Sequence, residues 1–265
     1  MRASDKEKSL RVVILAGGLG TRLSEETSVR PKPMIEIGGM PILWHIIKGF
    51  AACEVDRFTV ALGYKGDVVK SFFLDYQMMS SDVTISMEDG RVRHDRRTND
   101  AWTVDLVDTG LGTNTGGRLA ALREVIGEEQ TFCLTYGDGV SDVDIRDVAE
   151  THARSGKLAT VTAVRPPARF GGLDLDGDVV SHFNEKPSQG EGWINGGFMV
   201  LDRRVLDWVV GSDCNFETDV LALLANDGQL AAHRHEGFWH CMDTLRDVRH
   251  LQELWDSGSP PWRTW

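Results

Sequence analysis

The chain has 265 residues and a formal net charge of −11, with 41% hydrophobic and 26% charged residues. These proportions are those of a folded globular protein, and the acidic balance argues against nucleic-acid binding, because proteins that bind nucleic acids usually present a basic face. Any anionic ligand must therefore be met by a local cluster of cations.

The first ten residues, MRASDKEKSL, are polar and lack the apolar core of a signal peptide. No apolar run approaches the roughly 20 residues that a membrane helix needs. The four cysteines, Cys53, Cys133, Cys214 and Cys241, are widely spaced and form no CxxC pair, so neither a zinc site nor a disulfide framework is predicted. We therefore expect a cytoplasmic protein with reduced thiols and no membrane partner.

Apolar runs typical of buried strands alternate with helical patterns along the chain. Strands are expected at residues 12–16, 58–62, 131–135, 159–164 and 197–201, and helices at residues 42–50, 119–126 and 244–255. This alternation predicts an α/β fold in which helices flank a mixed, mostly parallel central sheet.

Two segments depart from this alternation. Residues 80–110 and 165–200 are richer in polar residues, glycine and proline, so we expect small β excursions from the core sheet there. Within the second segment, a hairpin is predicted around Asp176-Gly177. No internal repeat or linker is visible. The predicted organisation is a polar N-terminal extension at residues 1–10 and a single domain at residues 11–265.

The first expected strand runs directly into a glycine-rich loop. Gly17, Gly18 and Gly20 carry no side chains, so the backbone can approach a ligand closely and its N–H groups can bind phosphate. In an open α/β sheet, ligands bind beyond the carboxyl ends of the strands. The loop is therefore predicted to bind a nucleotide.

Three nucleotide-binding motifs could explain this loop. The dinucleotide fingerprint GxGxxG does not fit, because Leu23 stands in place of the last glycine, and the P-loop motif GxxxxGK[ST] is absent. GGxGTRL followed by PKP is instead the signature of sugar nucleotidyltransferases. In this interpretation Arg22 contacts the β- and γ-phosphates, and Lys32 lies between the α-phosphate and the incoming phosphate. The alternative is a solvated basic patch.

Longer motifs carry a closer resemblance. LAGGLGTRLSEET, RPKPMIEIGGMPILWHI and LGYKG are followed in order by TGGRL, TYGDGVSD, EKP, INGGF and MDTLRD. With these motifs the chain resembles the glucose-1-phosphate cytidylyltransferases over nearly all residues after the tenth. The resemblance implies a Rossmann-like nucleotidyltransferase fold. It also implies an enzyme that transfers CMP from CTP to α-D-glucose 1-phosphate, giving CDP-glucose and pyrophosphate.

The resemblance further implies roles for individual residues. Asp138 and Asp243 are expected to ligate a Mg²⁺ cofactor. The sugar phosphate is expected to contact Glu185, Lys186 and Asn195. Arg22 and Lys32 are expected to be catalytic. The expected nucleotide contacts are Leu15, Ala16, Gly17, Gly18, Leu19, Gly20, Thr21, Arg22, Lys32, Thr113, Arg118 and Gly137, with Arg118 contacting a phosphate.

The implied reaction is an in-line displacement at the α-phosphorus of CTP. It requires no general base, because the second pKa of a phosphate monoester is about 6 and the attacking oxygen is already ionised. The resemblance also implies a homo-oligomer, a trimer or a hexamer. Two alternatives stay open. One is the same chemistry with another nucleotide or sugar phosphate, and the other is a non-catalytic regulatory subunit that binds nucleotide sugars.

Overall fold

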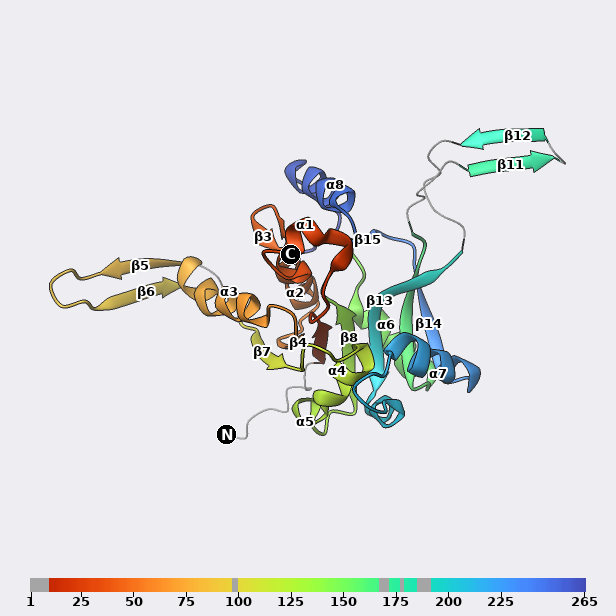
Figure 1. The fold of residues 1–265 in the computed structure, drawn as a ribbon, viewed down its shortest axis with the longest axis horizontal. Helices are drawn as coiled ribbons and strands as arrows, with labels where there is room; N and C mark the ends of the chain where they lie inside the picture. Colours follow the sequence, from red (N-terminus) through yellow and green to blue (C-terminus); the bar gives the residue numbers. More distant parts are fainter. Residues whose placement is uncertain (1–9, 97–99, 167–171, 177–178, 185–191) are drawn as a thin grey trace.

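A computed structural model describes residues 10–96, 100–166, 172–176, 179–184 and 192–265. Seven strands form one sheet in the order β14-β10-β13-β8-β1-β4-β7 (Figure 1). Their bounds are β1 Arg11–Leu15, β4 Arg57–Leu62, β7 Thr103–Asp108, β8 Thr131–Tyr136, β10 Ala159–Val164, β13 Ile194–Asp202 and β14 Leu230–His235. Only β13 runs antiparallel to its neighbours in this sheet, so the predicted mixed, mostly parallel sheet is confirmed.

The main helices are α2 Ile42–Ala52, α3 Gly66–Met79, α4 Thr115–Ala121, α5 Arg123–Ile126, α6 Ile145–Ser155, α7 Ala222–Asn226 and α8 Leu245–Asp256. The three expected helices correspond to α2, to α4 with α5, and to α8. Sequence reasoning missed α3, because Val69 is its one buried residue and leaves a weak helical pattern. It also missed α6, although Ile145, Val148 and His152 lie on one buried helical face.

Strand β1 separates two hydrophobic cores. Successive side chains of a strand point to opposite faces of the sheet. Val12 and Ile14 accordingly pack into one core with residues of α2 and α8, whereas Val13 and Leu15 pack into the other with residues of α4 and α5. Because both faces are covered, the strand is buried along its whole length and its carboxyl end is held rigidly.

Two hairpins project from the body of the molecule (Figure 1). Strands β5 Ser81–Ile85 and β6 Val92–Arg96 pair antiparallel beside α3, and β11 Gly172–Asp176 pairs with β12 Val179–Asn184. Both lie in the segments predicted as excursions, and the turn of the predicted second hairpin, residues 177–178, lies outside the described residues. The prediction was wrong for β7, which pairs with β4 at the edge of the central sheet. Its alternating sequence TVDLVD is that of an edge strand rather than of an excursion.

Smaller ribbons and turns complete the fold. These are α1 Ser24–Thr27, η1 Thr21–Leu23, η2 Lys32–Met34, η3 Arg203–Trp208, η4 Phe216–Leu221, β2 Glu36–Ile37, β3 Met40–Pro41, β9 Gly139–Ser141 and β15 Trp239–Cys241. Strand β9 follows β8 directly in the chain, and β15 pairs antiparallel with β9. Among the described helices, none has the length and apolar character that crossing a membrane requires.

An aromatic cluster packs the segment after α8 against α2. Trp262 is 1% exposed and stacks on Phe238 with ring centroids 5.6 Å apart. Its indole donates to Nδ1 of His45 at 3.4 Å, and Nε2 of His45 lies 2.8 Å from the carbonyl oxygen of Ile37. An indole N–H can only donate, so Nδ1 is the acceptor and Nε2 carries the single ring proton. Burial accordingly lowers the pKa of His45 to about 4.

Neutral His45 makes stability depend on pH. The ordinary pKa of histidine is about 6.5. Below that pH, His45 is protonated more often in the unfolded chain than in the folded protein. The stability that neutral His45 supplies is complete above pH 6.5 and is lost as the pH falls toward 4. Between pH 7 and pH 5, we expect the unfolding free energy to fall by about 2 kcal/mol more in the wild type than in His45→Gln, as urea unfolding at both pH values would measure.

The control is His250→Gln, which removes an exposed histidine of α8. We expect it to keep the pH dependence of the wild type. If His45→Gln instead lost as much stability as the wild type over this range, protonation of His45 would not be the cause.

Candidate functional site

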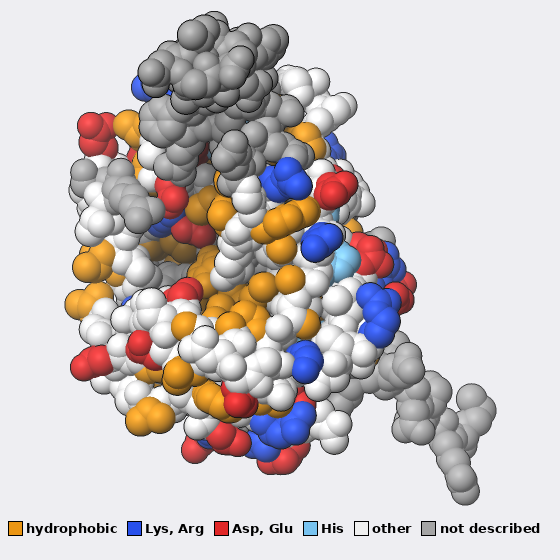
Figure 2. Space-filling model, turned by 90° about the vertical axis from the view of Figure 1, so that its right-hand side faces the viewer, with side chains coloured by type: hydrophobic (Ala, Val, Ile, Leu, Met, Phe, Trp, Pro, Cys, Tyr) orange, Lys and Arg blue, Asp and Glu red, His pale blue; other side chains and the backbone are white. Residues whose placement is uncertain are grey.

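A cavity of about 420 Å³ opens beyond the carboxyl ends of β1 and β8. A hollowed face is visible in Figure 2, with hydrophobic side chains on its walls and acidic and basic side chains beside them. The cavity is lined by Leu15, Ala16, Gly17, Gly18, Gly20, Thr21, Lys32, Pro33, Thr113, Asn114, Thr115, Arg118, Tyr136, Gly137, Asp138 and Asp243. It therefore lies where open α/β sheets bind their ligands.

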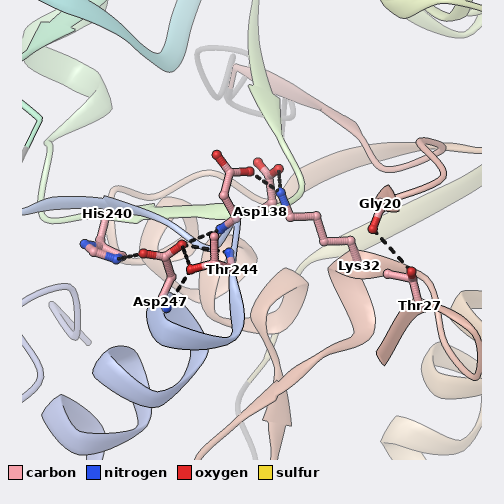
Figure 3. Close-up of polar contacts among 8 residues, drawn as sticks. Gly20, Thr27, Lys32, Asp138, His240, Thr244 and Asp247 are labelled. Atoms are coloured by element: carbon pink, nitrogen blue, oxygen red, sulfur yellow. Dashed lines mark hydrogen bonds and ion pairs between the residues drawn. The ribbon is translucent and has the colours of Figure 1, made fainter. Parts of the chain in front are cut away.

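The glycine loop forms one wall of this cavity. A Cβ on Gly17 would lie 2.1 Å from Nη1 of Arg118, and Gly20 has a φ of +62°, which other residues rarely adopt. Thr27 Oγ1 donates to the carbonyl oxygen of Gly20 at 3.2 Å (Figure 3). A Cβ on Gly18, in contrast, would meet nothing within 4 Å. The backbone at Gly18 is therefore open to a ligand, whereas its neighbours fix the shape of the loop.

Arg118 holds this loop from behind. Its guanidinium donates to the carbonyl oxygens of Gly17, Leu62 and Gly110 and to Oγ1 of Thr109, at distances of 2.9–3.1 Å. The residue is 5% exposed, and burial lowers its pKa below the ordinary value. These contacts favour a positioning role, because the guanidinium is already engaged by oxygens of the chain. Arg118 also lines the cavity, so the phosphate contact that we expected from it stays a prediction.

Lys32 joins the two aspartates that are expected to bind metal. Its Nζ lies 2.6 Å from Oδ2 of Asp138 and 2.7 Å from Oδ1 of Asp243, and its side chain is 13% exposed (Figure 3). Burial alone would lower the pKa of Lys32, but the charge of Asp138 and the hydrogen bonds to both carboxylates outweigh it and raise the pKa. Lys32 is therefore a protonated, ion-paired lysine and not a residue of a solvated patch.

Asp243 is positioned by the start of α8. Thr244 is the N-cap of this helix and forms a capping box with Asp247. Asp247 Oδ2 also accepts from the backbone N–H of Asp243 at 3.0 Å, and Oδ1 lies 3.2 Å from Nε2 of His240 (Figure 3). The capping role falls to Thr244, so the Asp243 carboxylate is directed at Lys32.

The two carboxylates fit a divalent cation. Mg²⁺ is usually held by one or two carboxylates together with phosphate oxygens of the substrate. Asp138 and Asp243 meet at the edge of the cavity, where the Lys32 ammonium already balances their charge. Sequence reasoning missed a third group beside them. Cys241 lies on β15 opposite Gly139, and burial raises the pKa of its thiol.

Sequence reasoning also missed a hydrogen-bond network on the opposite wall. The Tyr136 hydroxyl donates to Oε1 of Glu217, and Oε2 of Glu217 accepts from Oγ1 of Thr115 at 2.8 Å. Burial, followed by the charge of Glu217, raises the pKa of Tyr136, so its hydroxyl stays a neutral donor. The side chain of Asn195 opposes this rise in the Tyr136 pKa, so this predicted residue lies near a side chain that lines the cavity.

The remaining predicted residues divide into three groups. Thr113 and Gly137 line the cavity, and Thr113 Oγ1 donates to the carbonyl oxygens of Thr109 and Gly110. Leu19 is 54% exposed at the tip of the loop and does not line the cavity. The side chain of Arg22, as well as Glu185 and Lys186, lies outside the described residues.

The sequence of this chain is similar to those of known proteins. The sequence profile of the family described as nucleotidyl transferase matches residues 11–257. The chain is 48% identical over 256 residues to the glucose-1-phosphate cytidylyltransferase of Salmonella typhi, covering 97% of this chain and 100% of the relative. It is 39% identical over 257 residues to the probable glucose-1-phosphate cytidylyltransferase of Bacillus subtilis strain 168, covering 97% and 100% of the two chains.

A solved structure shares the fold. The crystal structure of HddC from Yersinia pseudotuberculosis, complexed with GMP-PN, matches with a TM-score of 0.66 and 25% sequence identity. The match covers 93% of this chain and 99% of that chain.

The role of Arg118 can be tested through stability. Arg118→Met would remove the four hydrogen bonds by which the buried guanidinium joins Gly17 to the segments at Leu62 and Thr109–Gly110, so we expect the unfolding free energy to fall by about 2–4 kcal/mol. Arg204→Met removes an exposed arginine paired with Asp202 and should change stability little. Urea unfolding of both variants at pH 7 makes the comparison. An equally small effect of both substitutions would contradict a positioning role.

Proposed function

The chain belongs to the nucleotidyl transferase family, and we propose that it transfers CMP from CTP to α-D-glucose 1-phosphate, giving CDP-glucose and pyrophosphate. The observation that carries the proposal is the meeting of Lys32, Asp138 and Asp243 at a cavity whose other wall is the glycine loop. The choice of CTP and glucose 1-phosphate is supported by the 48% identical relative, whose name includes both the sugar phosphate and the cytidylyl group.

The glycine loop would bind the triphosphate. Its backbone at Gly18 is open to the cavity, and successive N–H groups of such a loop can donate to phosphate oxygens. Arg118 would keep the loop in this shape, and we keep its expected contact with a phosphate as part of the proposal. Arg22 follows in η1, and we keep it as the proposed partner of the β- and γ-phosphates.

Lys32 would stabilise the charge that develops during the reaction. An oxygen of glucose 1-phosphate attacks the α-phosphorus, a new P–O bond forms, and the bond to the β-phosphate breaks, so that pyrophosphate leaves with the electron pair. The attacking oxygen carries no proton near neutral pH, so no general base is required. Protonated Lys32 would neutralise the negative charge around the α-phosphorus, which places it among the proposed catalytic residues.

Asp138 and Asp243 would hold the Mg²⁺ cofactor. When bound, the ion neutralises phosphate charge and orients the triphosphate. The Lys32 ammonium would then turn from the carboxylates toward the phosphates, because a cation beside the two aspartates replaces its charge. We place the sugar near Asn195, with Glu185 and Lys186 as further proposed partners. The homo-oligomer that the resemblance implies stays a prediction.

The proposed reaction can be tested with a nucleotide panel. We expect purified protein with Mg²⁺ and glucose 1-phosphate to release pyrophosphate with CTP, and to release far less with UTP, dTTP, ATP or GTP. EDTA should abolish the signal, because the two carboxylates would lose their cation. Release with a different nucleotide would keep the reaction class but overturn the choice of base. Silence with all five would count against the choice of glucose 1-phosphate.

Lys32 gives a second prediction. Lys32→Met should lower turnover by about 10²- to 10³-fold, as the loss of a preorganised charge-stabilising group typically does. Lys70→Met, an exposed lysine on α3, is the matched control and should keep wild-type turnover. Circular dichroism and thermal unfolding show whether both variants fold. Near-normal turnover in folded Lys32→Met would remove Lys32 from the proposed mechanism.

A further inference from the structure

A thiol lies among the carboxylates of the proposed metal site. Single ligand atoms of Asp138, Cys241 and Asp243 all lie within 4.8 Å of one another, and the three residues are half-buried. Ligand atoms that share a tetrahedral zinc ion lie roughly 3.3–3.8 Å apart, as bond lengths of about 2.0–2.3 Å require. Small side-chain rotations are enough to bring the three ligand atoms from within 4.8 Å of one another to this shorter spacing.

The backbone holds these three residues in place. Cys241 pairs with Gly139 across the β9–β15 ribbon, and the N–H of Met242 donates to the carbonyl oxygen of Asp138 at 2.8 Å. Asp243 follows two residues after Cys241, and its own N–H is bound by Asp247 at 3.0 Å. The cluster is therefore built on hydrogen-bonded main chain and not on a loose surface loop.

The positively charged side chain of Lys32 lies beside this cluster. The Lys32 ammonium donates to Asp138 and Asp243 at 2.6 and 2.7 Å. It shows that the two carboxylates face one point and that a positive charge is accommodated there. A metal ion that binds the carboxylates must compete with this ammonium or push it aside.

The chemistry of the third ligand selects the metal. Mg²⁺ prefers oxygen ligands and gains little from sulfur. A cysteine sulfur beside two carboxylates favours softer ions of the zinc group, for which thiolate is a strong ligand. The absence of a CxxC pair meant that the sequence predicted no zinc site, but a site assembled from the end of β8, β15 and the start of α8 needs no such pair.

We propose that Asp138, Cys241 and Asp243 form a binding site for a thiophilic divalent cation, Zn²⁺ or Cd²⁺, which competes with Mg²⁺ for the two carboxylates. On binding, a metal–sulfur bond replaces the S–H bond of Cys241, and the proton goes to the buffer. The competition with Mg²⁺ rests on the proposed function, whereas the binding of the thiophilic ion does not. Such an ion would occupy the place of the catalytic cation and inhibit the enzyme.

The test uses Cd²⁺, because cadmium–thiolate bonds give an ultraviolet charge-transfer band. Chelator-treated protein is titrated with CdCl₂ in a thiol-free reductant. We expect a band that saturates at one ion per chain in the wild type and is absent in Cys241→Ser. Cys53→Ser, another half-buried cysteine, should keep the band. Cd²⁺ affinity, measured by calorimetry, should fall by about tenfold or more in Cys241→Ser, at least the loss seen for outer-shell partners of metal ligands.

Two further measurements keep the proposal falsifiable. Asp243→Asn retains the thiol and should weaken Cd²⁺ binding, and excess Mg²⁺ should reduce the wild-type band. Circular dichroism shows that each variant folds. A band and an affinity that Cys241→Ser leaves unchanged would overturn the inference, whatever the enzyme's activity. Loss of the band in Cys241→Ser, in a protein that transfers no nucleotide, would uphold this site and refute only the proposed function.

Discussion

The ion pairs of Lys32 with Asp138 and Asp243 are the interaction on which the arrangement of the site depends. They join the segment after the glycine loop, the end of β8 and the start of α8. Unpaired, the two neighbouring carboxylates would repel one another in partly buried surroundings, and that repulsion would cost free energy. The lysine removes this cost while the substrate is absent. The same charge is then available beside the phosphates, so one side chain serves both the resting protein and the proposed reaction.

Arg118 and Lys32 both carry a positive charge, but they differ in what that charge contacts. The guanidinium of Arg118 presents several donors in one plane, which suits it to bind the carbonyl oxygens of three separate segments at once. The ammonium of Lys32 is compact and lies at the end of a flexible chain, which suits it to move between carboxylates and phosphates. An acidic protein thus uses one cation to fix its glycine loop and has another, beside two carboxylates, for the proposed contact with phosphate.

Much of the central sheet and of the glycine loop could be predicted from sequence, because these features depend on local patterns. The apolar run of β1 and the glycines after it define a buried strand and a loop, and the motif around Asp138 follows β8, the buried strand that pairs with β1. The pairing of Glu217 with Tyr136 could not be predicted, because no pattern links residues so distant in sequence. Cys241 was overlooked because it meets Asp138, from a distant segment, only when β15 pairs with β9. The burial of Arg118 could not be predicted either, because it emerges only from the packing of α4 against the glycine loop.

The contact between Lys32 and Asp243 joins residues 211 positions apart. Such separation slows folding, because a long stretch of chain must be ordered before the contact can form. Synthesis adds a delay, since the glycine loop leaves the ribosome long before α8 is made. During that interval a nascent chain can form β1 and the loop but has no second carboxylate. In the proposed mechanism an incomplete chain would therefore lack one metal ligand, and the proposed reaction would begin only when the whole sheet and α8 are in place.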